Sequence, residues 1–335
     1  MVEKRYRIEE KKLKGGATGY YLVKDLRFKE RKAKVSKYLG TERPDDPVAA
    51  SERHALELEL NAARKRAEMS VTQYRAKYED WPEGLRAIAA LEKLRFEWQA
   101  VEGLLHDDEV RAYEEAFEVR YVHGTTAIEG NTLSVSDTRL LLREGIVPPS
   151  KGLREINEVQ NFRLVKTLRD AHRGKVTLGF IRELHAAVMN NIDHDSAGRF
   201  RRTDLIGIAG RDIRPTPSVL IEEELAQAID DYYAGLEDGR YPLFEALRFH
   251  HRFEVVHPFT DGNGRVGREV LNYMLLRARF PRLLFLGSDR ERYLRALQMA
   301  DQGHYRRCLL EMSALLLEQR SEIVNDALSA LARGG

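Results

Sequence analysis

The stretch from His257 to Arg268 has the residue types and spacing of a phosphate-binding site. It reads HPFTDGNGRVGR, and apolar residues at helical spacing lie before and after it. The glycines of DGNG permit positive φ angles and a close approach of the backbone to a ligand. The loop leads into a helix predicted to begin near Arg265, and the free backbone N–H groups at a helix N-terminus attract anions. The pattern therefore predicts an anion-binding loop.

The charged residues of this stretch indicate what the anion is. Arg265 and Arg268 are three residues apart and extend from one side of the predicted helix. The helix dipole disfavours positive charge in the first turn by about 0.3–1 kcal/mol, so two guanidinium groups there indicate a polyanion such as a di- or triphosphate. Asp261 is a carboxylate of the kind that holds Mg²⁺ on phosphates. His257, at the helix end before Pro258, is predicted to be a general base, although a lone histidine there is more often structural.

Two other phosphate or metal motifs are missing. The sequence contains neither a GxxxxGK[ST] loop nor an HExxH pair. His250 and His257 share a helix face but lie about 10 Å apart by helix rise, which disfavours a histidine metal cluster.

The stretch resembles the signature of the Fic family, HPF-x-[DE]-GNG-R-x-x-R, at every fixed position. The flanking segments LRFHHRFEVV, SDRERYLRALQMADQG and GRFRRTDLIGIAG also resemble that family, over about residues 113–317. The resemblance implies a mainly α-helical fold with a small β-hairpin flap that clamps a target. It also implies transfer of AMP from ATP, with Mg²⁺, to a Ser, Thr or Tyr hydroxyl of a target protein.

Carried over position by position, the resemblance implies a role for each residue of the motif. His257 would deprotonate the hydroxyl group, and Asp261 would bind Mg²⁺. Phe259 would be the buried anchor of the loop, and Tyr293 aligns with a family tyrosine near the nucleoside. The second arginine of the motif would reach the γ-phosphate. The phosphate-binding residues would be Gly262, Asn263, Gly264, Arg265 and Arg268.

A second motif, TTAIEGN, lies upstream of the loop. Thr125, Glu129 and Gly130 match the family's inhibitory pattern, [ST]-x-x-x-E-[GN]. A carboxylate in the last turn of a helix opposes the dipole and favours a cationic partner, although a solvated surface charge is the simpler alternative. The resemblance implies that Glu129 pairs with Arg268 and blocks the γ-phosphate within the same chain. In some relatives the same glutamate positions the water that removes AMP from a modified protein, so both directions stay open.

The chain divides into three predicted parts: a basic β-hairpin module at residues 1–44, a helical region at 45–110, and a Fic domain at 111–335 that includes the inhibitory helix. Alternating apolar residues on both sides of FKERK predict the hairpin. The Gly- and Pro-containing segment 198–218 predicts a second hairpin or flap. Further helices are predicted at 154–173, 178–190, 220–237, 243–256, 265–279, 290–300 and from about 305.

Composition limits the cellular setting. The chain has 335 residues, a net charge of +2 and one cysteine, Cys308, which excludes an intrachain disulfide and fits a reducing cytosol. No run is apolar enough for a signal peptide or membrane span, so we predict a cytoplasmic protein without membrane contact. Residues 1–44 hold 14 Lys and Arg against 6 Asp and Glu. This surplus indicates either a nucleic-acid or partner surface or a solvated basic face.

Two rival functions remain at this stage. The first is another transfer on the same scaffold: kinase-like, phosphocholine, UMP or GMP transfer, or removal of AMP. The second is a nucleic-acid-binding regulator whose Fic part senses nucleotide without catalysis, which the basic N-terminus motivates. The presence of His257 disfavours pure sensing, since a sensor needs no base. A homodimer is compatible with either function.

Overall fold

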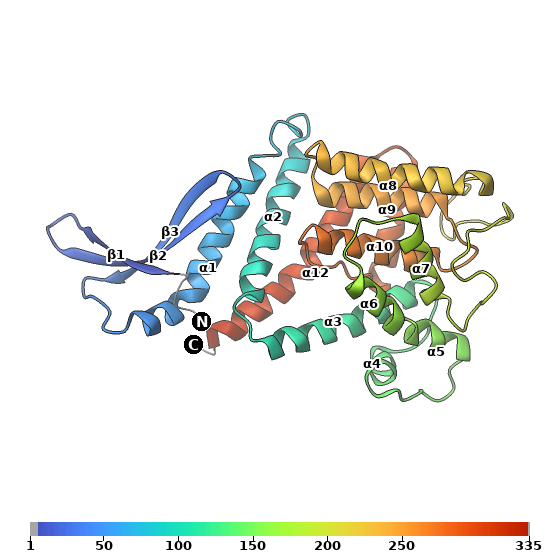
Figure 1. The fold of residues 1–335 in the computed structure, drawn as a ribbon, viewed down its shortest axis with the longest axis horizontal. Coiled ribbons are helices and arrows are strands. Elements are labelled where there is room, and N and C mark those ends of the chain that lie inside the picture. Colours follow the sequence, from blue (N-terminus) through green and yellow to red (C-terminus); the bar gives the residue numbers. More distant parts are fainter. Residues whose placement is uncertain (1–5, 334–335) are drawn as a thin grey trace. The chain divides into compact units, whose positions relative to one another are not determined.

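The computed structural model describes residues 6–333, with side chains described as far as residue 321. The chain forms two compact units, residues 1–110 together with 317–335, and residues 111–316. Helices dominate both units, and the strands form one small antiparallel sheet near the N-terminus (Figure 1). The predicted mainly α-helical class is confirmed. Among the described residues, no helix combines the length and apolar character needed to cross a bilayer.

The N-terminal sheet has three strands in the order β1 (Arg7–Lys12), β2 (Thr18–Phe28) and β3 (Arg31–Gly40). The predicted hairpin is confirmed as β2 and β3, which pair Tyr21 with Tyr38. Strand β1 was not predicted, because RIEEKK carries a single apolar residue and lies at the edge of the sheet. The first five residues of the predicted 1–44 module lie outside the described residues.

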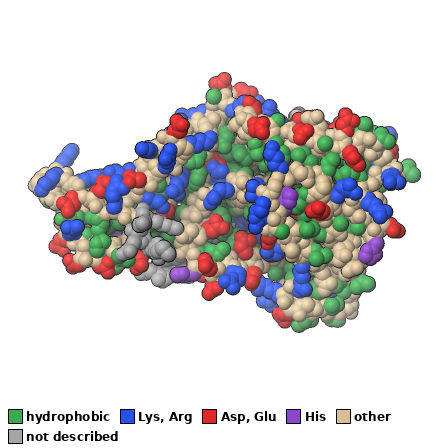
Figure 2. Space-filling view, in the orientation of Figure 1, with side chains coloured by type: hydrophobic (Ala, Val, Ile, Leu, Met, Phe, Trp, Pro, Cys, Tyr) green, Lys and Arg blue, Asp and Glu red, His purple; other side chains and the backbone are tan. Residues whose placement is uncertain are grey.

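The sheet packs against helix α1 (Pro47–Val71), which in turn packs on α2 (Pro82–Glu102). Leu22 and Leu26 of β2 are buried, and Lys24 between them forms an ion pair with the buried Glu59 of α1. Lys37 pairs with Glu57 in the same way, at 2.6 Å. Acidic and basic side chains are interspersed over this sheet (Figure 2). Part of the basic surplus therefore neutralises α1 within the unit.

The second unit consists of helices joined by loops. Its helices α8, α9 and α10 pack side by side (Figure 1). The helix α12 (Tyr305–Arg333) begins in this unit and continues into the first. The remaining helices are α3 (Asp107–Ile128), α4 (Val135–Glu144), α5 (Leu153–Gln160), α6 (Phe162–Ala171), α7 (Leu178–Val188), α8 (Ile221–Glu237), α9 (Pro242–Val256), α10 (Asn263–Arg277) and α11 (Arg290–Asp301).

Two predicted elements differ from the structure. The single helix predicted at 154–173 is divided at Asn161, whose side-chain amide donates to the carbonyls of Val188 and Asn190. The hairpin predicted at residues 198–218 is not formed, and this fully described segment contains no strand. Pro215 and Pro217 lack the N–H donors that a strand ladder requires.

A buried ion network fixes α3 beside the helices of the second unit. Arg169 of α6 donates to Glu118 of α3 and to Glu269 of α10, at 3.2 and 3.0 Å. Arg169 and Glu269 are almost fully buried, so removing one partner would leave an uncompensated charge. The network therefore links the middle of α3 to α6 and α10.

Candidate active site

The loop between α9 and α10 is held from within. Phe259 is fully buried and stacks on the His185 ring, with ring centroids 3.7 Å apart. The side chain of Asn263 makes two hydrogen bonds of 2.8 Å to the backbone of Phe259, accepting from its N–H and donating to its carbonyl. The His185 ring also contacts the loop through Nε2, 3.0 Å from the carbonyl oxygen of Asp261. The predicted anchor role of Phe259 matches this packing.

Replacing Asn263 by alanine is expected to lower the free energy of unfolding by about 2–4 kcal/mol, because two buried backbone groups lose their partners. Urea denaturation followed by circular dichroism measures the loss. Gln298→Ala is the matched control, since that amide makes one exposed hydrogen bond, to Gly210. Equal stability of the two variants would contradict the role of the Asn263 side chain in holding the loop.

His257 ends α9 in the left-handed conformation, with φ 48° and ψ 60°. Its backbone carbonyl accepts a 2.9 Å hydrogen bond from Nε of the buried Arg201. The backbone N–H of Arg201 also donates to the Pro258 carbonyl. Burial lowers the pKa of His257 to about 4, against the opposing effect of the Glu254 carbonyl. The imidazole is therefore neutral at pH 7 and able to accept a proton.

Helix α10 begins at Asn263, two residues earlier than predicted, and Gly262 precedes it with a φ of +77°. Arg265 thus lies in the first turn and Arg268 in the second. Both side chains are buried, at 2% and 1% exposure. Contrary to the sequence argument, neither guanidinium group depends on an external polyanion for neutralisation, because each already faces a carboxylate of this chain.

Arg268 contacts the end of α3. Its Nη2 donates to Oε1 of Glu129 at 2.7 Å and to the Thr125 carbonyl at 2.9 Å, while its Nε donates to Thr125 Oγ1 at 2.8 Å. Despite burial, the carboxylate of Glu129 raises the pKa of Arg268. A Cβ atom at Gly264 would lie 2.3 Å from Glu129 Oε1. Gly130, with a φ of +99°, ends the segment after α3.

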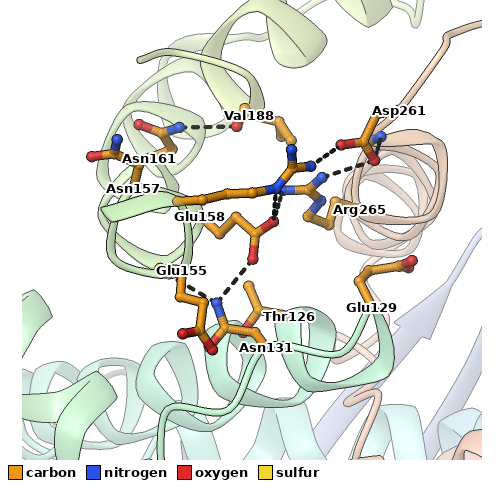
Figure 3. Close-up of polar contacts among 12 residues, drawn as sticks. Thr126, Glu129, Asn131, Glu155, Asn157, Glu158, Asn161, Val188, Asp261 and Arg265 are labelled. Carbon is orange, nitrogen blue, oxygen red and sulfur yellow. Dashed lines mark hydrogen bonds and ion pairs between the residues drawn. The ribbon is translucent and has the colours of Figure 1, made fainter. Parts of the chain in front are cut away.

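Arg265 lies between two carboxylates. Its Nη2 is 3.2 Å from Oδ1 of Asp261, and its Nη1 is 3.5 Å from Oε1 of Glu158 on α5. Glu158 also accepts a 2.9 Å hydrogen bond from Asn131, the second residue after Glu129. Figure 3 shows Glu158 between Arg265 and Asn131. The Arg265 guanidinium group is thus connected to the segment that carries Glu129.

Asp261 receives more cationic contacts than the sequence indicated. Its carboxylate accepts from Arg265, from the Gly262 N–H at 2.6 Å and from Arg154 of α5. Although burial raises the pKa of Asp261, the charges of Arg265 and Arg154 and the Gly262 N–H hold it below the usual range. Asp261 is ionised at neutral pH.

Tyr293 is placed least favourably among the predicted ligand-binding residues. Its side chain is buried, and its hydroxyl lies 2.8 Å from Nε2 of His250. His250 in turn contacts the Gly267 carbonyl through Nδ1 at 3.1 Å. In this conformation the tyrosine lines the interior behind Arg268, and burial raises its pKa.

Sequence reasoning missed the residues that position the motif: Arg154, Glu158, His185 and Arg201. Only Arg201 carried a signal, as the arginine of the GRFR segment. Arg154 and Glu158 form an i, i+4 pair on α5, which by itself resembles any solvated helix face. His185 lies in an apolar helix, where a buried structural histidine is the usual case.

Residues 175–275 match the family model described as Fic/DOC. The chain is 35% identical over 192 residues to the protein adenylyltransferase fic-1 of Caenorhabditis briggsae, and 31% identical over 201 residues to the protein adenylyltransferase Fic of Nematostella vectensis. These alignments cover 56% and 58% of this chain but only 37% and 46% of the relatives. The chain therefore spans less than half the length of these curated relatives.

Solved structures share the fold. A Fic-1 segment from Caenorhabditis elegans aligns with a TM-score of 0.65 at 24% identity, covering 84% of each chain. A Fic family protein from Desulfovibrio desulfuricans aligns with a TM-score of 0.63 at 25% identity, covering 73% of this chain and 75% of the other.

Proposed function

Since this chain carries a Fic domain, we propose that it is a protein adenylyltransferase that transfers AMP from Mg-ATP to a hydroxyl side chain of a target protein and of itself. The observation that carries the proposal is the placement of His257, held through its carbonyl by Arg201, at the start of the loop that leads into α10. A phosphate site without a base would support nucleotide binding alone, whereas the two together support a transfer reaction.

In this proposal, the triphosphate binds at the N-terminus of α10. The backbone of Gly262, Asn263 and Gly264 surrounds the α- and β-phosphates, where the N–H groups of the first helical turn and the helix dipole attract anions. Arg265 grips the β-phosphate, and Arg268 reaches the γ-phosphate once Glu129 releases it. Tyr293 supports this region from behind, near the nucleoside.

The metal is proposed to arrive with the nucleotide. Among the described residues there is no cluster of three or more His, Cys, Asp or Glu side chains that suits a resident ion. Mg²⁺ usually binds through one or two carboxylates together with substrate phosphates, and the partly exposed, ionised Asp261 fits that role. When bound, Mg²⁺ would neutralise charge on the phosphates.

The transfer step is a substitution at the α-phosphorus. The target hydroxyl oxygen forms a bond to this phosphorus, the bond to the β-phosphate oxygen breaks, and pyrophosphate leaves. The proton of the hydroxyl group passes to His257, whose lowered pKa keeps it unprotonated beforehand. The helix dipole of α10 and Arg265 stabilise the charge that develops on the phosphates.

Glu129 is proposed to inhibit this reaction within the chain. Its carboxylate occupies Nη2 of Arg268, which Thr125 also contacts, and Gly130 lets the chain turn after α3. A γ-phosphate that needs the same guanidinium group must compete with this ion pair. The competition holds the chain in a weakly active state.

Incubation with labelled ATP and Mg²⁺ tests the function. Label retained on protein from α-labelled but not γ-labelled ATP supports AMP transfer, and mass spectrometry then shows an addition of ~329 Da, the AMP residue mass by its formula. Retention from γ-labelled ATP would indicate phosphorylation and contradict the proposal. We also propose a cytoplasmic location, consistent with the intracellular substrate ATP and the single buried Cys308.

A further inference from the structure

Four charged side chains close a ring beside the proposed phosphate site. Asp261 contacts Arg154 and Arg265, and Glu158 contacts the same two arginines, at 3.3 Å from Arg154 Nε and 3.5 Å from Arg265 Nη1. Charges alternate around the ring: Arg154 and Glu158 belong to α5, Arg265 belongs to α10, and Asp261 lies in the loop before α10. Asp261, the proposed magnesium ligand, is therefore already neutralised by cations of the chain itself.

The two arginines differ in their freedom to leave Asp261. The Arg265 side chain is 2% exposed and starts inside α10, whereas the Arg154 side chain is 60% exposed. Arg154 is the second residue of α5, where the helix dipole disfavours a cation, so its position depends on the carboxylates. Arg154 is the partner that can move.

The carboxylate is less free than Arg154. Asp261 Oδ1 accepts a 2.6 Å hydrogen bond from the Gly262 N–H, and the Asp261 carbonyl contacts His185 Nε2 at 3.0 Å. Arg154 binds the other oxygen, Oδ2. A divalent ion that binds Oδ2 of Asp261 therefore competes with the Arg154 guanidinium group for a nearly fixed carboxylate oxygen.

From this geometry, and resting on the proposed function, we propose that Arg154 is a displaceable internal cation that occupies Asp261 until a divalent ion arrives with the nucleotide. The exchange keeps a positive partner on Oδ2 of Asp261 in either state, while Arg265 stays on Oδ1. It also raises the magnesium concentration that nucleotide binding requires, because the ion competes with Arg154 for the same oxygen.

Glu158 keeps the site assembled during this exchange. When Arg154 leaves, Glu158 still pairs with Arg265 and still accepts the 2.9 Å hydrogen bond from Asn131. The buried Arg265 therefore retains a counter-charge and stays in place. Glu158 is a positioning residue, since it acts through Arg265.

The test measures ATP binding by calorimetry, without reading activity, in the full chain carrying Glu129→Gly. ATP affinity is measured first in a chelator buffer without magnesium and then at increasing magnesium concentrations. Adding Arg154→Ala is expected to lower the magnesium concentration at which ATP affinity rises half-maximally by about threefold. A change of this size corresponds to the free energy of a partly exposed ion pair. Arg154→Lys retains a cation, and its midpoint is expected to stay closer to that of the parent. Arg139→Ala, at an exposed arginine of α4, serves as control.

The outcomes separate this inference from the function. If Arg154→Ala leaves the magnesium midpoint unchanged, or weakens ATP binding equally with and without magnesium, Arg154 is not a competing cation and the inference is wrong. The proposed function survives that result. If the parent binds no ATP at any magnesium concentration, the proposed function fails, and the inference fails with it.

Discussion

Replacing Glu129 by glycine is expected to raise the rate of AMP transfer by about tenfold to a hundredfold, the range that corresponds to a hydrogen bond between charged groups worth about 1.5–3 kcal/mol. The carboxylate of Glu129 holds Arg268 Nη2 at 2.7 Å and is 38% exposed, whereas the guanidinium group is buried. Glycine removes the carboxylate but leaves both Thr125 contacts to Arg268. Arg268 is then available for the γ-phosphate. Incorporation of label from α-labelled ATP into the chain itself measures the rate.

The matched control is Glu115→Ala, which removes an exposed ion pair with Arg143 elsewhere on α3. Its rate is expected to equal that of the wild type. An unchanged rate in Glu129→Gly at saturating Mg-ATP would contradict the inhibitory role. If Glu129→Gly instead abolishes removal of AMP from a modified protein, the glutamate serves the reverse reaction.

Thermal unfolding provides a second measure of the same variant. Without nucleotide, Glu129→Gly leaves the buried Arg268 charge without its carboxylate, so the midpoint temperature is expected to fall. Mg-ATP is expected to raise this midpoint more than it does in the wild type, because at a given concentration a ligand that binds more tightly stabilises the folded state more. A merely destabilised chain would show the first effect alone.

Local sequence was sufficient to predict α9 and the loop that follows it, but not the division of the helix at 154–173. The apolar spacing before the loop predicts α9 from local causes, and the structure confirms this helix. Pro258 and the glycines of the loop likewise act on their own backbone. Such features can be predicted because each depends on neighbours a few residues away.

The ion pairs could not be predicted from local sequence. Arg154 and Asp261 are 107 residues apart, and Arg268 and Glu129 are 139 apart, so only the fold brings them together. The family pattern supplied the second pair, whereas the pair of Arg154 and Asp261 corresponds to no motif. The early start of α10 was missed because Asn263 bonds its side chain to Phe259 while also beginning the helix.

Arg265, Arg268 and Asp261, the proposed phosphate and magnesium ligands, thus all have charged partners within the chain. In the proposed function, Glu129 occupies the arginine that a γ-phosphate would bind, and Arg154 occupies the carboxylate that a divalent ion would bind. Nucleotide binding would then exchange one set of ion pairs for another. The net gain in free energy is smaller than the contacts alone suggest, which favours regulation by small changes in α3 or α5.

Replacing His257 by alanine is expected to lower AMP transfer by about 10²–10⁴-fold, the contribution of a positioned general base. The comparison is best made in the Glu129→Gly chain, where the starting rate is highest, with His194→Ala at an exposed histidine as control. Calorimetry should find ATP affinity little changed, because Arg201 contacts the His257 carbonyl, which alanine keeps. A similar loss of ATP affinity would instead indicate a collapsed loop.

The pH dependence of the same reaction tests the role of burial. A base acts while it is neutral, and burial lowers the pKa of His257 to about 4. The rate is therefore expected to stay level from about pH 8 to about pH 5.5 and to fall only as pH approaches 4, whereas an ordinary histidine would already be half protonated near pH 6.5. The folded chain must survive the acid range, so circular dichroism at each pH separates protonation from unfolding. A midpoint near pH 6.5 in a folded chain would mean that the His257 imidazole is solvated in the reacting chain, and it would contradict the effect of burial on its pKa.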